Sequence, residues 1–246
     1  MNNLQETLLF PVRDAEARKQ FLFASLVILV GFIIPIIPML ILTGYSAKIM
    51  RQIIDERKDP SMPDWQKSDW AEMLTDGLRI YGAQLVYMLP IMLIVGFGIL
   101  SLMSGSIAAS VSISDNGQSL APVGIPLFIV GFAVVMFFSL LALPYSVIIS
   151  VVGPHVAATR SFASAFQIKD WWGIFRKALG QFILAFVITM VISWVLGFVI
   201  QIAFITIVLI CIVPFILIPF TAYNLLLKST LLAQAYVAGL DKLKEG

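Results

Sequence analysis

Five long apolar runs constrain this chain more than any other feature of its sequence. Each reaches the roughly 20 residues that a membrane-spanning helix needs, and none alternates between apolar and polar side chains as the strands of a membrane barrel do. Hydrophobic residues make up 60% of the chain and charged residues only 12%, about half the charged fraction of a soluble domain. We therefore expect an all-α fold, a polytopic transmembrane helical bundle that forms a single integral membrane domain over residues 1–246. The runs cover residues 21–43, 82–103, 123–149, 182–202 and 203–227.

The positions of the cationic side chains predict the orientation of these helices. All sixteen Lys and Arg residues lie within residues 13–79, 160–177 and 228–244. By the positive-inside rule, these regions face the cytoplasm and the chain crosses the membrane several times. The amphipathic connector 45–80 and the C-terminal tail 228–246 are then cytoplasmic.

The first run, residues 21–43, allows two arrangements. It contains Gly31, Pro35 and Pro38, which interrupt a regular helix. A single kinked span would place residues 1–19 outside, against the charge rule. A short re-entrant hairpin would keep both of its ends in the cytoplasm, with the amphipathic lead-in 1–19 lying in the membrane interface. The sequence leaves both arrangements open.

The connector contains a pattern that recurs later in the chain. Residues 68–87 align without gaps with residues 169–188, so that Asp69-Trp70 falls on a second Asp-Trp pair. In both segments apolar side chains recur at helical spacing and lead directly into an apolar run. This pattern predicts cytoplasmic amphipathic helices at the membrane interface and a possible internal repeat, with Asp69 as a helix cap.

His155 is the one histidine of the chain and a weak candidate for a cofactor ligand or a pH-sensitive group. An interfacial position at the Gly153-Pro154 break explains it more simply. One His and one distant cysteine, Cys211, cannot supply the three or four protein ligands of a zinc site. We therefore expect no metal site and no cofactor, and we interpret Cys211 as a small packing residue.

The acidic residues of the connector predict a solvated surface. A cluster of carboxylates could bind a divalent cation, but neighbouring cations balance these charges and favour a wet surface above the membrane. The acids are Asp55, Glu56, Asp59, Asp64, Asp69, Glu72 and Asp76, and the cations are Arg51, Arg57, Lys58, Lys67 and Arg79.

The apolar runs contain no Asp, Glu, Lys, Arg or His, which removes the usual parts of a proton relay or an ion-coupled transporter. Ser193 and Gly197 form a small-xxx-small pair that favours close helix packing. Catalytic motifs and basic patches are absent, so we expect neither an enzyme nor a nucleic-acid-binding protein. We expect the polar side chains in or beside the runs to form interhelical hydrogen bonds; they are Gln84, Gln181, Gln201 and Asn224.

Several short motifs resemble one known family. They are LLFPVRDAEARKQ at 8–20, Pro38 with Gly44-Tyr45, IMRQII at 49–54, MPDW at 62–65, DWAEMLTDGL at 69–78 and YMLP at 87–90. The chain resembles the uncharacterised prokaryotic membrane family catalogued as domain of unknown function 4013. Its link ERKDPSMPDWQKSDW departs from that family's pattern, in which a shorter link is expected. The resemblance implies a polytopic bacterial or archaeal membrane protein and carries over no catalytic residue.

These observations favour a non-catalytic integral membrane protein that serves as a scaffold or accessory subunit of a membrane complex. The alternative is a transporter or lipid-binding protein with a site between the helical repeats, near the proline kinks. The expected partners are membrane lipids and either a second protein or another copy of the chain in the membrane.

Overall fold

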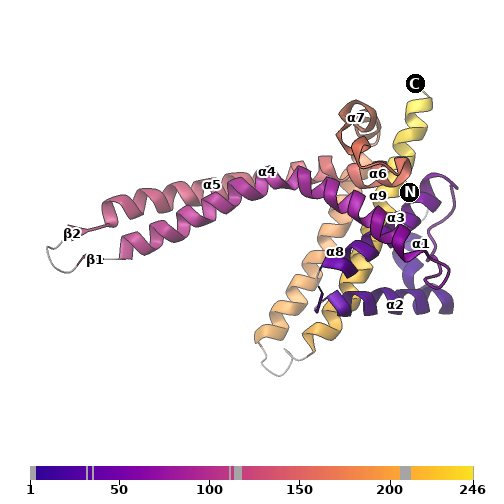
Figure 1. Ribbon diagram of the computed structural model, residues 1–246, viewed down its shortest axis with the longest axis horizontal. Helices are drawn as coiled ribbons and strands as arrows, with labels where there is room; N and C mark the ends of the chain where they lie inside the picture. Colours follow the sequence, from indigo (N-terminus) through magenta and orange to yellow (C-terminus); the bar gives the residue numbers. More distant parts are fainter. Residues whose placement is uncertain are drawn as a thin grey trace. The chain divides into compact units, whose positions relative to one another are not determined.

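The protein is almost entirely helical, which confirms the predicted fold class. The computed structural model describes residues 4–31, 33–34, 36–110, 112–113, 118–205 and 212–245. Figure 1 shows the elements in order: α1 Leu4–Leu9, the 3-10 turn η1 Phe10–Val12, α2 Ala15–Gly31, α3 Ile36–Ile54, α4 Trp70–Ser110, α5 Ala121–Ile149, α6 Val152–Thr159, the 3-10 turn η2 Ala163–Phe166, α7 Ile168–Lys177, α8 Leu179–Ile205 and α9 Val213–Lys244. Two short strands, β1 Ser112–Ile113 and β2 Gln118–Ser119, pair antiparallel.

Four helical stretches among these residues are long and apolar enough to cross a membrane, as the sequence predicts for an integral membrane protein. They are Trp70–Ser110, Ala121–Thr159, Leu179–Phe204 and Val213–Lys244. Polar residues extend α4 and α9 well beyond their predicted runs. The boundary between the last two runs differs from the prediction, because α8 continues to Ile205 and α9 begins at Val213. Cys211, predicted to be a packing residue, lies outside the described residues.

The chain divides into two compact units, and α4 belongs to both. One unit consists of residues 85–149, and the other of residues 1–84 together with 150–246. Each is described by itself below.

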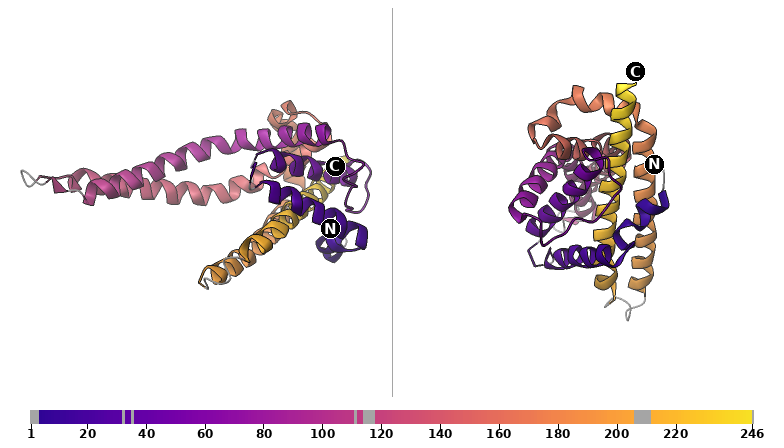
Figure 2. Two further views of the ribbon diagram at one scale, coloured as in Figure 1. Left: turned by 60° about the horizontal axis from the view of Figure 1, so that its bottom comes forward. Right: turned by 90° about the vertical axis from the view of Figure 1, so that its right-hand side faces the viewer.

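The smaller unit is an antiparallel helical hairpin of α4 and α5, which lie side by side in both views of Figure 2. Two glycines of α4, Gly98 and Gly105, and two of α5, Gly124 and Gly131, occur with the same spacing of seven residues. A Cβ atom added to Gly105, Gly124 or Gly131 would overlap backbone atoms of the opposite helix. Glycine is therefore required at these three positions for the two helices to approach this closely.

The larger unit is built around α9. This helix contacts α1, α2, α3, α6, α7 and α8, and its side chains from Leu226 to Tyr236 form much of the core. Residues 228–244, predicted to be part of a cytoplasmic tail, are instead the second half of α9. Leu231, Ala233 and Ala235 are fully buried there, so part of this segment belongs to the interior of the unit.

Residues 21–43 are divided between α2 and α3, which pack against each other and against α9. Asp14 caps α2 by accepting a hydrogen bond from the backbone N–H of Ala17 at 2.7 Å. The helix ends at Gly31, and Pro38 lies in the first turn of α3, where a proline is tolerated. The two helices form the hairpin geometry that the re-entrant alternative requires.

The two segments of the predicted repeat differ in how their helices begin. Asp69 caps α4 by accepting from the N–H of Ala71 at 2.9 Å, whereas the matching Asp170 lies inside α7. Further along, the matching residues Met73 and Ile174 each lie directly against a glycine of another helix, Gly44 in α3 and Gly239 in α9. The two segments of the repeat are therefore alike in how their helices pack against a glycine, but not in how the first turns of these helices are capped.

The glycine contacts of the hairpin give a direct test. Replacing Gly105 with Leu should lower the free energy of unfolding by about 3 kcal/mol, the upper end of overpacking costs, because the side chain has no space against α5. Gly96 provides the control, since a Cβ atom there would meet nothing within 4 Å. Thermal unfolding in mild detergent compares Gly105→Leu with Gly96→Leu. Equal melting temperatures for the two variants would contradict the proposed contact.

Candidate functional site: the charged cluster between α3 and α4

The site is located where α3 crosses the first turns of α4. A Cβ atom on Gly44 would overlap the backbone carbonyl of Met73, and one on Gly77 would overlap the carbonyl of Leu40. Each helix therefore presents a glycine to the backbone of the other. This close crossing brings the charged residues of the following turns within ion-pairing distance.

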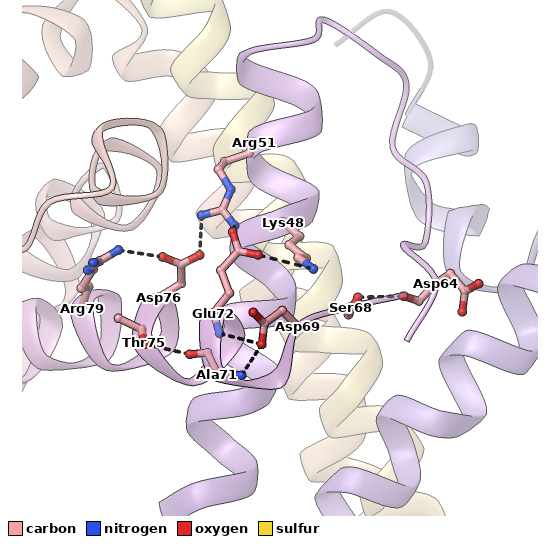
Figure 3. Close-up of polar contacts among 10 residues, drawn as sticks. All are labelled: Lys48, Arg51, Asp64, Ser68, Asp69, Ala71, Glu72, Thr75, Asp76 and Arg79. Carbon is pink, nitrogen blue, oxygen red and sulfur yellow. Dashed lines mark hydrogen bonds and ion pairs between the residues drawn. The ribbon is translucent and has the colours of Figure 1, made fainter. Parts of the chain in front are cut away.

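Five side chains form what we call the α3–α4 cluster: Lys48, Arg51, Glu72, Asp76 and Arg79 (Figure 3). The Arg51 guanidinium donates to Asp76 Oδ2 at 2.5 Å and to Glu72 Oε1 at 3.3 Å. Arg79 donates to the second oxygen of Asp76 at 3.1 Å, and Lys48 Nζ lies 3.9 Å from Glu72 Oε2. Both oxygens of Asp76 thus have a cationic partner.

The centre of the cluster is buried. The side chains of Arg51 and Asp76 are only 8% and 5% exposed, whereas Glu72 and Arg79 lie at its solvent side. A buried charge is strongly unfavourable unless it is paired and hydrogen-bonded. The prediction of a solvated surface is therefore wrong for Arg51 and Asp76, although Asp55, Glu56, Asp59 and Asp69 are exposed as predicted.

An aromatic contact holds the connecting loop against α3 next to the cluster. The ring of Trp65 stacks on Tyr45 with centroids 4.0 Å apart. Trp65 also donates its indole N–H to the carbonyl of Gln20 at 3.0 Å, and the Gln20 side chain accepts from the Trp65 backbone N–H at 3.2 Å. The loop is thereby fixed to both α2 and α3.

The Tyr45 hydroxyl completes this contact by donating to the carbonyl of Pro63 at 2.6 Å. Burial, with a smaller contribution from the Asp64 carboxylate, raises the pKa of Tyr45 far above its ordinary value. Tyr45 therefore stays protonated at all physiological pH values and remains a hydrogen-bond donor to the loop.

An open pocket of about 380 Å³ borders the cluster. Its charged lining residues carry four positive and four negative side chains, so it selects neither anions nor cations by net charge. No group of three or more His, Cys, Asp or Glu residues in the described part of the chain could hold a metal ion. The charged lining residues are Lys48, Arg51, Lys67, Arg160, Asp55, Glu56, Asp64 and Glu72.

His155 lies apart from this cluster, in the interior of the larger unit. Its Nδ1 atom is 2.8 Å from the hydroxyl of Tyr236, and only 5% of the residue is exposed. Its Nε2 atom has no hydrogen-bond partner among the described residues. The contact with Tyr236 accounts for one of the two ring nitrogens, and a cofactor role for His155 stays a prediction.

The polar side chains in or beside the apolar runs differ in their contacts and in their exposure. Asn224 of α9 donates to the Ser193 hydroxyl of α8 at 2.9 Å, which confirms the expected interhelical hydrogen bond. A Cβ atom on Gly197 would meet nothing within 4 Å, so its predicted close packing does not occur within the described part of this chain. Gln201 is exposed, and Gln181 lines a polar pocket at the charged end of α9.

Four of the motifs that resemble the family meet at this site, although their residue types alone indicate no chemistry. They are Gly44-Tyr45, IMRQII at 49–54, MPDW at 62–65 and DWAEMLTDGL at 69–78. Arg51 pairs with Asp76, Tyr45 stacks on Trp65, and Gly44 lies against Met73. The motifs thus mark one set of mutual contacts.

Comparison with known proteins agrees with this pattern. The family described as protein of unknown function (DUF4013) matches residues 27–209, which is most of the chain. The protein therefore belongs to this family. No curated protein and no solved structure matches the chain significantly.

The buried ion pair predicts a specific pattern of stability. Replacing Asp76 with Leu leaves Arg51 buried beside the partly exposed Glu72 alone, which should cost about 3 kcal/mol. Changing Arg51 to Met in the same chain should restore most of the loss, because no unpaired buried charge then remains. Thermal unfolding of the single and double variants measures both effects.

Glu56→Gln is the control for this experiment, because the Glu56–Lys58 ion pair is exposed and its loss should cost no more than about 1 kcal/mol. An Asp76→Leu variant as stable as this control would show that the cluster does not hold α3 and α4 together.

Proposed function

We propose that this member of the DUF4013 family is a non-catalytic integral membrane protein that serves as a scaffold or accessory subunit of a membrane complex. The observation that carries the proposal is the internal pairing of the α3–α4 cluster. Arg51 donates to both Asp76 and Glu72, and both oxygens of Asp76 accept hydrogen bonds within the chain, so the charges of this pair are balanced internally rather than by a substrate. A catalytic or transport site needs polar groups that are available to its ligand.

The pockets along the apolar helices support the same proposal. Two pockets, of about 310 and 300 Å³, are lined by apolar side chains and by Thr221. The Thr221 hydroxyl donates to the carbonyl of Leu217 within its own helix at 2.7 Å. Neither pocket offers the free polar groups near the midplane that coordinate a transported ion or polar substrate.

We further propose that the protein lies in a prokaryotic inner membrane with its charged regions in the cytoplasm. The α3–α4 cluster, α7 and the charged end of α9 are then on one side, as the positive-inside rule requires. The amphipathic helix α7 buries Trp171, Ile174 and Phe175 within the protein, where it packs on α9, and its charged residues are exposed, which suits the water-facing side of the membrane boundary.

In this orientation the α2–α3 hairpin enters one leaflet and returns. Gly31 and Pro38, near its tip, line a pocket with Leu217 and Ile218 of α9. Lys228 lies ten positions after Ile218, about 15 Å along a helix and about half the thickness of the hydrocarbon core. This spacing supports a hairpin tip near the bilayer midplane, with both ends on the charged side.

A second candidate function is lipid binding, and the two apolar pockets favour it. Both include Pro38 in their lining, which agrees with the alternative site near the proline kinks. Apolar pockets beside a re-entrant hairpin would take acyl chains rather than polar solutes.

Purification in mild detergent separates the two functions. A scaffold or subunit should elute as a complex of fixed stoichiometry, either with another protein or with further copies of itself. Native mass spectrometry of the purified material determines the mass and the composition. A single chain accompanied only by lipid would contradict the scaffold proposal and favour lipid binding.

A further inference from the structure

One apolar groove follows the α2–α3 hairpin along its length. Phe23, Leu26 and Val30 line it from α2, Ile37 and Ile41 from α3, and Trp70 closes one end from α4. Its volume is about 310 Å³. The side chains of Phe23, Leu26, Val30, Ile37 and Trp70 remain largely exposed, although large apolar side chains favour burial. The groove is therefore a surface that needs an apolar occupant.

The length of the groove limits what it can hold. Its α2 wall starts at Phe23 and continues past Val30 to Ile34, near the tip of the hairpin. From Phe23 to the end of α2 at Gly31 the helix rises about 12 Å, which is less than the roughly 15 Å depth of hydrocarbon in one leaflet. A segment of one acyl chain therefore fits along this wall.

The end of the groove at Trp70 has the character of a membrane interface. Trp70 lies near Phe23 and Trp65, with ring centroids 6.4 and 5.7 Å away. Tryptophan prefers the level of the lipid headgroups, since its ring is apolar and its N–H is polar. This end is thus the one from which a lipid chain would enter.

Charged residues of both signs lie close in sequence to the residues at this end. Lys19 lies one helical turn before Phe23 and is 4.0 Å from Glu16, and Lys67 lies three residues before Trp70 and is 3.8 Å from Asp64. All but Asp64 are largely exposed. A headgroup that carries both a phosphate and an ammonium matches this alternation, because each of its charges finds an opposite partner.

We propose that this groove holds one acyl chain of a zwitterionic phospholipid such as phosphatidylethanolamine. The chain lies against Leu26 and Val30, and the headgroup lies beside Lys19 and Lys67. The inference rests on the proposed orientation of the hairpin in the membrane, and it holds whether the protein acts as a scaffold or as a lipid-binding protein.

Lipid retention tests this site. The protein is reconstituted with phosphatidylethanolamine, extracted into mild detergent and examined by native mass spectrometry. The wild-type chain should retain one phosphatidylethanolamine molecule. Val30→Trp fills the groove and should reduce retention about tenfold, whereas Leu29→Trp, an exposed position of α2 outside the groove, should leave it unchanged.

Two further measurements complete the test. Reconstitution with phosphatidylglycerol should give lower retention, and equal or higher retention would overturn the assignment of the headgroup. In the wild-type protein, phosphatidylethanolamine with a photoreactive acyl chain should crosslink to the segment that contains Leu26 and Val30. Absence of that crosslink, or full retention by Val30→Trp, would overturn the site.

The same spectra distinguish this inference from the scaffold proposal. A complex of fixed stoichiometry without retained lipid would contradict the lipid site and leave the scaffold proposal standing. A single chain that retains its lipid would contradict the scaffold proposal and leave the lipid site standing.

Discussion

The packing of α9 against six other helices is the interaction on which the larger unit depends. The apolar first half of this helix contributes Leu217 and Ile218 to the contact with the α2–α3 hairpin, and the second half buries Leu231, Ala233 and Ala235. α9 thus connects the part of the unit whose apolar surface suits a bilayer with the part whose charged surface suits water. Because α2 and α3 pack on α9, their depth in the membrane follows from its position.

The low polarity of the protein interior explains why the buried charged side chains of the α3–α4 cluster are closely paired. A buried guanidinium is tolerated only with partners at close range, and Arg51 has them in Asp76 and Glu72. The glycines at the α3–α4 crossing make this possible, because they let the two backbones touch. Several of the motifs that resemble the family therefore hold α2, α3 and α4 together.

The sequence predicts features that depend on local properties. The apolar runs predict the four membrane-crossing helices because hydrophobicity acts over neighbouring residues, and Asp69 is recognisable as a cap from its position before Trp70 and Glu72. Pairing between distant segments was not predictable in this way. The burial of Arg51 with Asp76, the glycine contacts of α4 with α5 and the buried second half of α9 all require a knowledge of which helices meet.

The central claim is that the α2–α3 hairpin docks on α9 and ends within the bilayer. Replacing Cys211 with Ser gives a chain without cysteine, into which Glu6→Cys and Ile33→Cys are introduced separately. A membrane-impermeant maleimide is applied to intact cells and to inverted vesicles. The account predicts that position 6 reacts only in inverted vesicles and that position 33 reacts in neither until the membrane is dissolved. Reaction of position 6 in intact cells would contradict it, because the first run would then cross the membrane once.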